Sequence, residues 1–390
     1  MNKQPIEFEN YKFDQTFLNK FNLETERANS FSFTEFSNKK IFNGFSIIDS
    51  LLNLEKQVEH KRVPKNINKR ITLKTGINLV LEFYERLDLK TNVEDIILNK
   101  NDMFNTKIDR TITQSSVGHH DENPKIDFNV GYDGSLESIS TIAHESAHAI
   151  CGHYTELAKL LKEQNEIIAK FGNPSNELDN FKKSKFNIFM IKQNTLNHDC
   201  IGEIETHIIE KLFMKFLFEK NTITEDDQEI FLQNLNNSFR LNLRLIFEEN
   251  TIYSEILKIK KSNNNKDDNL TETEFEELYK SLSQKHHFND LMHKLKFIAE
   301  RTSNDFSRYR FRYVVAEVVS TVWINKYENA TKQEKAEMLL KLKEYILKSH
   351  MFDINTVIPH LIENATLESV INDFVQIHQT NLNNNNQQTP

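Results

Sequence analysis

The chain has 390 residues, enough for two or three domains, but only eight are glycine and six are proline. This scarcity excludes folds that need many tight turns or a glycine-rich phosphate loop, such as β-sandwiches and dinucleotide-binding folds. The net charge of −8 argues against a protein that binds nucleic acid or an anionic membrane through a positively charged surface. We therefore expect a mostly helical protein that binds neither.

The cysteine content and the start of the chain indicate the cellular compartment in which the protein is expected. Cys151 and Cys200 are the two cysteines, and they form neither a disulfide framework nor a CxxC pair. The first residues mix charged and apolar side chains, and no apolar run long enough to span a membrane is visible. We expect a cytoplasmic protein, while export by a route that needs no cleaved signal stays open.

The composition and the spacing of apolar residues divide the sequence into three regions. Residues 1–110 have helical spacing without a chemical motif, and we expect an N-terminal helical region there. Alternating apolar and polar residues predict two short strands, around 108–112 and 125–130. We expect residues 111–382 to form a catalytic domain, and the Asn- and Gln-rich residues 383–390 to be a disordered tail.

A turn and a helix follow the second strand. Gly131 and Gly134 favour a turn, and Ser135 is a suitable N-cap. Apolar residues then recur at helical spacing as far as Ile150, which predicts a helix over 136–150.

This helix contains an HExxH pattern formed by His144, Glu145 and His148. Residues four apart lie on one helix face, so the two imidazoles can bind one metal ion at about 2.0–2.1 Å. Glu145 is placed to activate a zinc-bound water and to pass its proton to the leaving amine. The alternative is an amphipathic helix whose histidines are ordinary surface groups.

A hydrolytic zinc site needs a third protein ligand and an open position. The best downstream segment is 198–210, which is rich in acidic residues and histidine. Spacing alone leaves Glu203, Glu205, His207 and His198 in competition.

Several segments resemble the thimet oligopeptidase and oligoendopeptidase F family of gluzincin peptidases. Residues 129–148 are similar to the family's strand, turn and zinc helix, and Gly202–Thr206 with Glu210 is similar to its third-ligand helix. Phe239–Glu248 and Tyr309–Val318 resemble two later helices, the second being the aromatic run whose tyrosines face the substrate. The resemblance covers about two thirds of the chain.

The resemblance implies a role for each matching residue. Glu203 would be the third ligand of one zinc ion per chain, with Thr206 and Glu210 supporting the ligands. Tyr313, or Tyr309 as second candidate, would donate its hydroxyl to the oxyanion of the intermediate. The implied fold is a gluzincin-type helical metallopeptidase with a small antiparallel β-sheet beside the HExxH helix.

The implied activity is a zinc metalloendopeptidase that hydrolyses oligopeptides or an extended protein segment. A peptide would add to the sheet along Phe128, Asn129, Val130 and Gly131, where main-chain hydrogen bonds would align it whatever its sequence. The expected partner is therefore a peptide or protein substrate, and the sequence does not give the oligomeric state.

Two departures from the family motivate alternatives. His148 and Glu203 are 55 positions apart, more than is usual in the family, which implies an inserted helical hairpin around Gly172 and Pro174. Arg301–Asn304 stand where the family carries a histidine that assists substrate binding. One alternative is a catalytically idle descendant that binds peptides; another is a secreted effector-type protease with a single protein target. A plain helical interaction protein is the weakest alternative.

Overall fold

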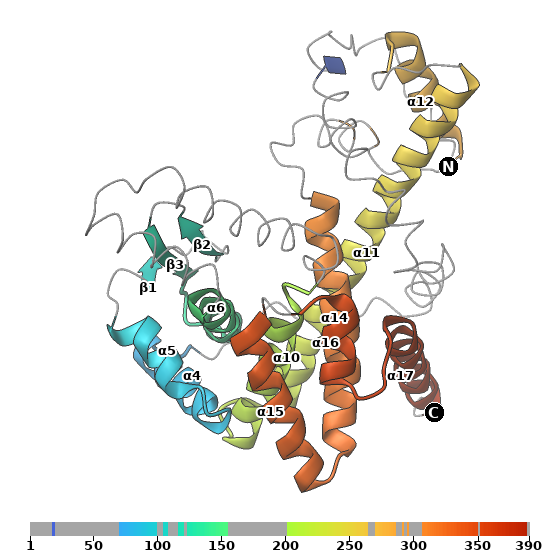
Figure 1. Cartoon of the computed structure of the whole chain (residues 1–390). Coiled ribbons are helices and arrows are strands. Elements are labelled where there is room, and N and C mark those ends of the chain that lie inside the picture. The colour runs from blue at the N-terminus through green and yellow to red at the C-terminus, as the bar shows by residue number, and fades with distance from the viewer. Residues whose placement is uncertain are drawn as a thin grey trace, which may run out of the picture. The chain divides into compact units, whose positions relative to one another are not determined.

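The structure, a computed structural model, is mostly helical in its described residues, as predicted (Figure 1). The described residues are 18–19, 70–99, 104–107, 116–120, 123–154, 201–263, 270–285, 291, 295, 306–349 and 352–387. The expected hairpin around Gly172 and Pro174, the candidate ligand His198 and the expected strand at 108–112 lie outside these residues.

The chain divides into two compact units. The first comprises Met1–Asp49 and Leu243–Ser307, and the second comprises Ser50–Asn242 and Arg308–Pro390. This division differs from the expected boundary near residue 110. Local patterns predict helices, but which helices share a core depends on contacts between distant segments.

The second unit contains the sheet and most helices. Its helical elements are α4 (Leu73–Arg86), α5 (Lys90–Glu94), the π-helical turn η2 (Asp95–Asn99), α6 (Leu136–Tyr154), α10 (Ile204–Glu219), α14 (Phe306–Asn329), α15 (Lys332–Lys348), α16 (Ile354–Leu361) and α17 (Leu367–Gln387). Helix α11 (Glu225–Ser262) begins in this unit and continues into the first.

Three strands form a mixed sheet in the order β1-β3-β2. They are β1 (Phe104–Lys107), β2 (Ser116–His120) and β3 (Asn123–Gly131). β2, a strand that the sequence did not predict, pairs with β3 in antiparallel fashion, whereas β1 pairs with β3 in parallel. The expectation of a wholly antiparallel sheet is therefore wrong, because a further strand, β1, lies on the opposite side of β3.

The turn between β3 and α6 depends on a glycine and a cap. Gly134 has φ +83°, and a Cβ there would lie 3.1 Å from the carbonyl oxygen of Ile71, so a side chain would be both strained and crowded. Ser135 Oγ accepts a hydrogen bond from the backbone N–H of Ser138 at 3.1 Å. The backbone N–H of Ile71 also donates to the Gly134 carbonyl. The start of α6 is thus fixed to the segment before α4.

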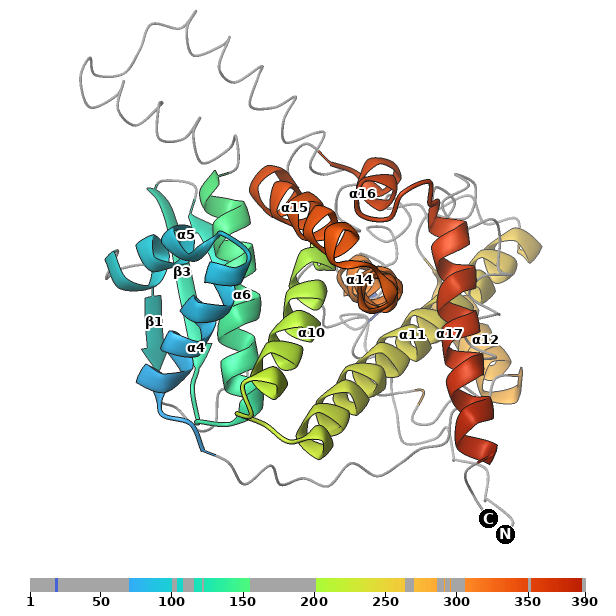
Figure 2. The same cartoon turned by 90° about the horizontal axis from the view of Figure 1, so that it is seen from below.

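Helix α6 packs against both α4 and α10, and these two helices also contact each other (Figure 2). Its buried residues lie all round the helix, which is typical of a helix in the centre of a domain. Alanines at 143, 147 and 149 are fully buried, and such small side chains let neighbouring helices approach closely. The sheet covers a further part of α6 through β2 and β3.

Helix α4 is joined to both α6 and α10. The hydroxyl of Tyr84, which is fully buried, donates to the carbonyl of Ala143 in α6 at 2.7 Å. Phe83 packs edge-on against Phe213 of α10 with ring centroids 5.3 Å apart. This explains why α4 belongs to the unit of the HExxH helix and not to a separate N-terminal region.

The first unit has its own apolar core. The later part of α11 contributes Ile252, Ile256 and Ile259, and α12 (Glu272–Lys285) contributes Phe275, Leu278 and Leu282. The remaining core residues are Leu18, Leu270, Leu291 and Leu295. The buried carboxylate of Glu255 accepts from Ser281 at 2.7 Å and from Lys258 at 2.6 Å.

At the C-terminus, α17 continues to Gln387. The expectation of a disordered tail from residue 383 is therefore wrong for 383–387, because polar side chains are tolerated on a helix that has already been nucleated upstream. In the part of the chain that the structure describes, every helix is too short or too polar to cross a membrane.

We predict that Tyr84→Phe lowers the free energy of unfolding by about 1 kcal/mol, because it removes a buried hydrogen bond between α4 and α6. The measurement is the midpoint of denaturant unfolding at an unchanged slope. Tyr327→Phe, which removes the hydroxyl of a half-buried tyrosine on α14, is the control and should have a smaller effect. An unchanged midpoint for Tyr84→Phe would contradict the role of this contact.

Candidate metal centre

Two neighbouring elements supply the candidate ligands. His144 and His148 lie one turn apart on α6, and Glu203 is the N-cap residue of α10. Because α6 and α10 pack together, the three side chains converge. One ligand atom from each lies within 4.8 Å of the other two. These three residues could hold a metal ion, and no other such group occurs among the described residues.

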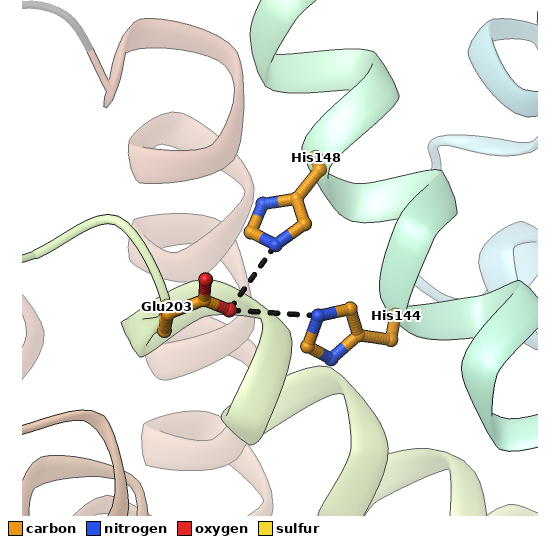
Figure 3. Close-up of side chains that lie close together, drawn as sticks. All are labelled: His144, His148 and Glu203. Atoms are coloured by element: carbon orange, nitrogen blue, oxygen red, sulfur yellow. Dashed lines mark hydrogen bonds and ion pairs between the residues drawn. The ribbon is translucent and has the colours of Figure 1, made fainter. Parts of the chain in front are cut away.

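The two separations between Glu203 and the imidazoles are close to those of ligands around one ion (Figure 3). Glu203 Oε2 lies 3.2 Å from His148 Nε2 and 3.5 Å from His144 Nε2. Tetrahedral bonds of about 2.0–2.1 Å place neighbouring ligand atoms about 3.3 Å apart. Both carboxylate–imidazole separations are therefore close to this value, and the three ligand atoms all lie within 4.8 Å of one another.

The outer nitrogen of each imidazole faces another carboxyl group of α10. His144 Nδ1 lies 2.9 Å from Glu210 Oε1, and His148 Nδ1 lies 3.5 Å from Glu205 Oε1. A metal-binding histidine usually donates its other N–H in this way, which fixes the tautomer that leaves Nε2 for the metal. Both Nε2 atoms thus point toward Glu203 and both Nδ1 atoms away from it.

Glu203 itself is held by Thr206. The Thr206 hydroxyl lies 3.2 Å from Glu203 Oε2 and 3.0 Å from the Glu203 carbonyl oxygen, and it is fully buried. The structure therefore places Thr206 and Glu210 beside the ligands, as the resemblance implied.

Glu205 has a position that the sequence did not identify. The sequence left Glu205 open as the third metal ligand, but in the structure its carboxyl group lies behind His148, next to Nδ1. Glu205 Oε2 is 3.0 Å from the hydroxyl of Tyr345 on α15, and Glu205 Oε1 is 3.8 Å from the thiol of Cys151. No spacing rule predicts this role, because it depends on how α15 packs on α6 and α10.

Electrostatics favour a cation at the centre. Burial raises the pKa of Glu203, but His148 and His144 outweigh burial and hold that pKa well below its usual range. Burial lowers the pKa of His144, but Glu210 and Glu203 raise it to about 10. The carboxyl groups thus draw positive charge to both imidazoles, and a metal ion would provide that charge in place of protons.

The proposed catalytic residues lie on the same helices or next to them. Glu145 is buried on α6 directly after His144, with 5 % of its surface exposed. Tyr313 on α14 lies beside His207 of α10, with ring centroids 5.9 Å apart. Tyr309 lies one turn earlier on α14, and its side chain is outside the described part.

The expected peptide-binding strand is corrected by the sheet register. β3 is the central strand, and its residues Phe128 and Asn129 are paired with β1 on one side and β2 on the other. Val130 and Gly131 are paired with β1. A peptide therefore has no strand edge to join alongside Phe128 and Asn129, so the expectation is wrong for these two.

A second group of charges is buried between α10 and α14. Glu317 Oε1 accepts from Lys211 Nζ at 2.8 Å, and Glu317 Oε2 lies 3.2 Å from His207 Nδ1. All three side chains are buried. His207, a competing ligand candidate in the sequence, is therefore engaged with α14.

The chain matches no protein-family model, no curated protein and no solved structure. The chemistry of the site is therefore argued from its own residues.

We predict that Glu203→Ala abolishes stoichiometric metal binding, because it removes one of three ligands. Glu205→Gln should retain the metal with about 10- to 100-fold weaker affinity, because it loosens His148 without removing a ligand. Metal content and competition with a chelator measure both effects. Glu137→Gln, an exposed site on α6, is the matched control. Loss of metal in Glu205→Gln with retention in Glu203→Ala would refute the ligand choice.

A pH-dependent contribution to stability is predicted for Glu317. Burial raises the pKa of Glu317, but Lys211 and His207 lower it from 4.5 to about 2. Its carboxylate therefore stabilises the fold above pH 4.5, by about 3 kcal/mol, and this contribution is lost as the pH falls toward 2. The difference in unfolding free energy between the wild type and Glu317→Gln should shrink over that interval. A difference independent of pH would contradict the assignment.

Proposed function

We propose that the protein is a zinc-dependent metallopeptidase, with one zinc ion held by His144, His148 and Glu203. The observation that carries the proposal is the convergence of two Nε2 atoms on one carboxylate oxygen at separations of 3.2 and 3.5 Å. Nitrogen and carboxylate ligands of this kind suit zinc.

The number of ligands favours catalysis over a structural role. Structural zinc sites usually have four protein ligands, whereas hydrolytic sites have three and an open position. Three ligands are found here within the described residues. The set of two histidines and one glutamate is also the one that the resemblance to gluzincins implies, and we extend the proposal to a gluzincin-type fold.

The buried carboxyl group of Glu145 would serve as the general base and acid. Zinc, when bound, lowers the pKa of a coordinated water to about 7 and polarises a carbonyl. Glu145 follows His144 directly and is removed from solvent, so it would take a proton at the site and return it to the leaving amine nitrogen. His144 and His148 would be kept in the metal-binding tautomer by Glu210 and Glu205.

Tyr313 would stabilise the charge that develops on the substrate's carbonyl oxygen, with Tyr309 as the second candidate. A neutral phenol can donate one hydrogen bond to an oxyanion without repelling a cation. The support for Tyr313 is its contact with His207, which lies on α10 one turn after Glu203.

An extended peptide would add to the sheet at β2 instead of β3. Among the described strands β2 lies at an edge of the sheet, and together with β3 it lies against α6. Main-chain hydrogen bonds to this edge would align peptides of different sequence.

We predict that Glu145→Gln retains zinc and lowers the rate of peptide cleavage by about 10²–10⁴-fold, because the general base is lost. The test is cleavage-site profiling of the purified full chain against a mixed peptide pool, with metal analysis of the same samples. Glu137→Gln makes the same chemical change at an exposed position of α6 and should leave the rate unchanged.

The outcomes separate the alternatives. An equal rate in Glu145→Gln would overturn the mechanism. Bound zinc without turnover of any peptide or protein would favour an idle peptide-binding descendant, whereas cleavage of one protein and of no short peptide would favour an effector-type protease.

A further inference from the structure

The buried charges between α10 and α14 are not required to bind metal. Lys211 Nζ donates to Glu317, to Ser320 Oγ at 2.9 Å and to Thr321 Oγ1 at 2.7 Å. His207 faces the other oxygen of the same carboxylate. One glutamate of α14 therefore joins two side chains of α10, one helical turn apart.

Stability alone is a poor explanation for this group. Removing two charges from water costs several kcal/mol per ion, and apolar residues of similar volume often stabilise a helix contact equally well or better. Apolar residues of α14 are buried close by in sequence, among them Val314, Val318 and Val319. A fixed geometry is what a buried, hydrogen-bonded pair adds to such a contact.

The location of His207 on α10 indicates which side chains this buried group holds in place. It is four residues after Glu203 and three before Glu210, so the three side chains lie on one face of α10. Both glutamates contact His144. His207 therefore lies on the stripe of α10 that faces the candidate metal centre.

The facing helix repeats this arrangement. Tyr313 is four residues before Glu317, so the two share one face of α14. The His207 ring contacts Tyr313 while its Nδ1 contacts Glu317. Because a carboxylate only accepts, Nδ1 carries the proton of that hydrogen bond, and the ring is held in one orientation.

We propose that Glu317 is a positioning residue that holds His207 against Tyr313 and thereby sets the placement of this tyrosine relative to the metal ligand Glu203. The proposal rests on the proposed function, in which Tyr313 acts on the substrate. A displacement of about 1 Å in a catalytic group can cost about 100-fold in rate, so the effect should be measurable.

A double-mutant cycle tests this coupling in the full-length protein. Glu317→Gln should lower kcat about 10- to 100-fold, with zinc content and KM nearly unchanged. In a Tyr313→Phe background the same substitution should change kcat less than about 3-fold, because the group that it positions is already lost. Equal losses in both backgrounds, or loss of zinc, would overturn the proposal.

Glu328→Gln is the matched control. It makes the same change on α14 and removes an ion pair to α10, with Lys215 at 3.1 Å, but this pair is on the surface. Its kcat should remain within about 2-fold of the wild type. A loss equal to that of Glu317→Gln would show that any link between the two helices has this effect.

A second measurement does not depend on activity. With ¹³C-labelled histidine and tyrosine rings, the wild type should show a nuclear Overhauser effect between His207 and Tyr313, assigned with His207→Gln. This signal should be lost in Glu317→Gln and retained in Glu328→Gln. If no peptide is cleaved by the wild type, the proposed function fails, and this signal still decides the positioning role. Its retention in Glu317→Gln would refute that role.

Discussion

The packing of α6 against α10 is the constraint on which the site depends. It places the Nε2 atoms of His144 and His148 around one oxygen of Glu203, and it places Glu205 and Glu210 behind the same two imidazoles. Five polar side chains in a largely buried contact would be costly to bury without partners. Their mutual pairing satisfies them together, and a metal ion, which His144, His148 and Glu203 could hold, would add to this pairing.

The other elements of the second unit maintain this contact from outside. Tyr84 bonds to α6 at the carbonyl of Ala143, next to His144, and Tyr345 reaches Glu205 from α15. Glu317 engages α10 from α14. Helices α4, α14 and α15, which are distant from one another in sequence, therefore hold α6 and α10 in place. The geometry of the site depends on the whole unit.

Local chemistry explains what could be predicted. The helix over residues 136–150 and its cap at Ser135 follow from short-range patterns, and the structure has both. The contact between Glu205 and His148 could not be predicted, because it depends on which side of α10 meets His148. The sheet order, and the joining of Met1–Asp49 with Leu243–Ser307, likewise depend on contacts between distant segments. The family resemblance, not spacing, distinguished Glu203 from its competitors.

The location of Glu203 before the first turn of α10 has a thermodynamic consequence. Bringing it to His148 closes a chain segment of 55 residues, and the entropic cost of such a closure is about 3.5 kcal/mol plus a constant. Here the apolar contact between α6 and α10 makes that closure. A metal ion bound by His144, His148 and Glu203 would then enter a preorganised site, and its binding free energy would be available for affinity instead of for ordering the chain. This is the reverse of a zinc finger, whose fold forms only when the ion binds.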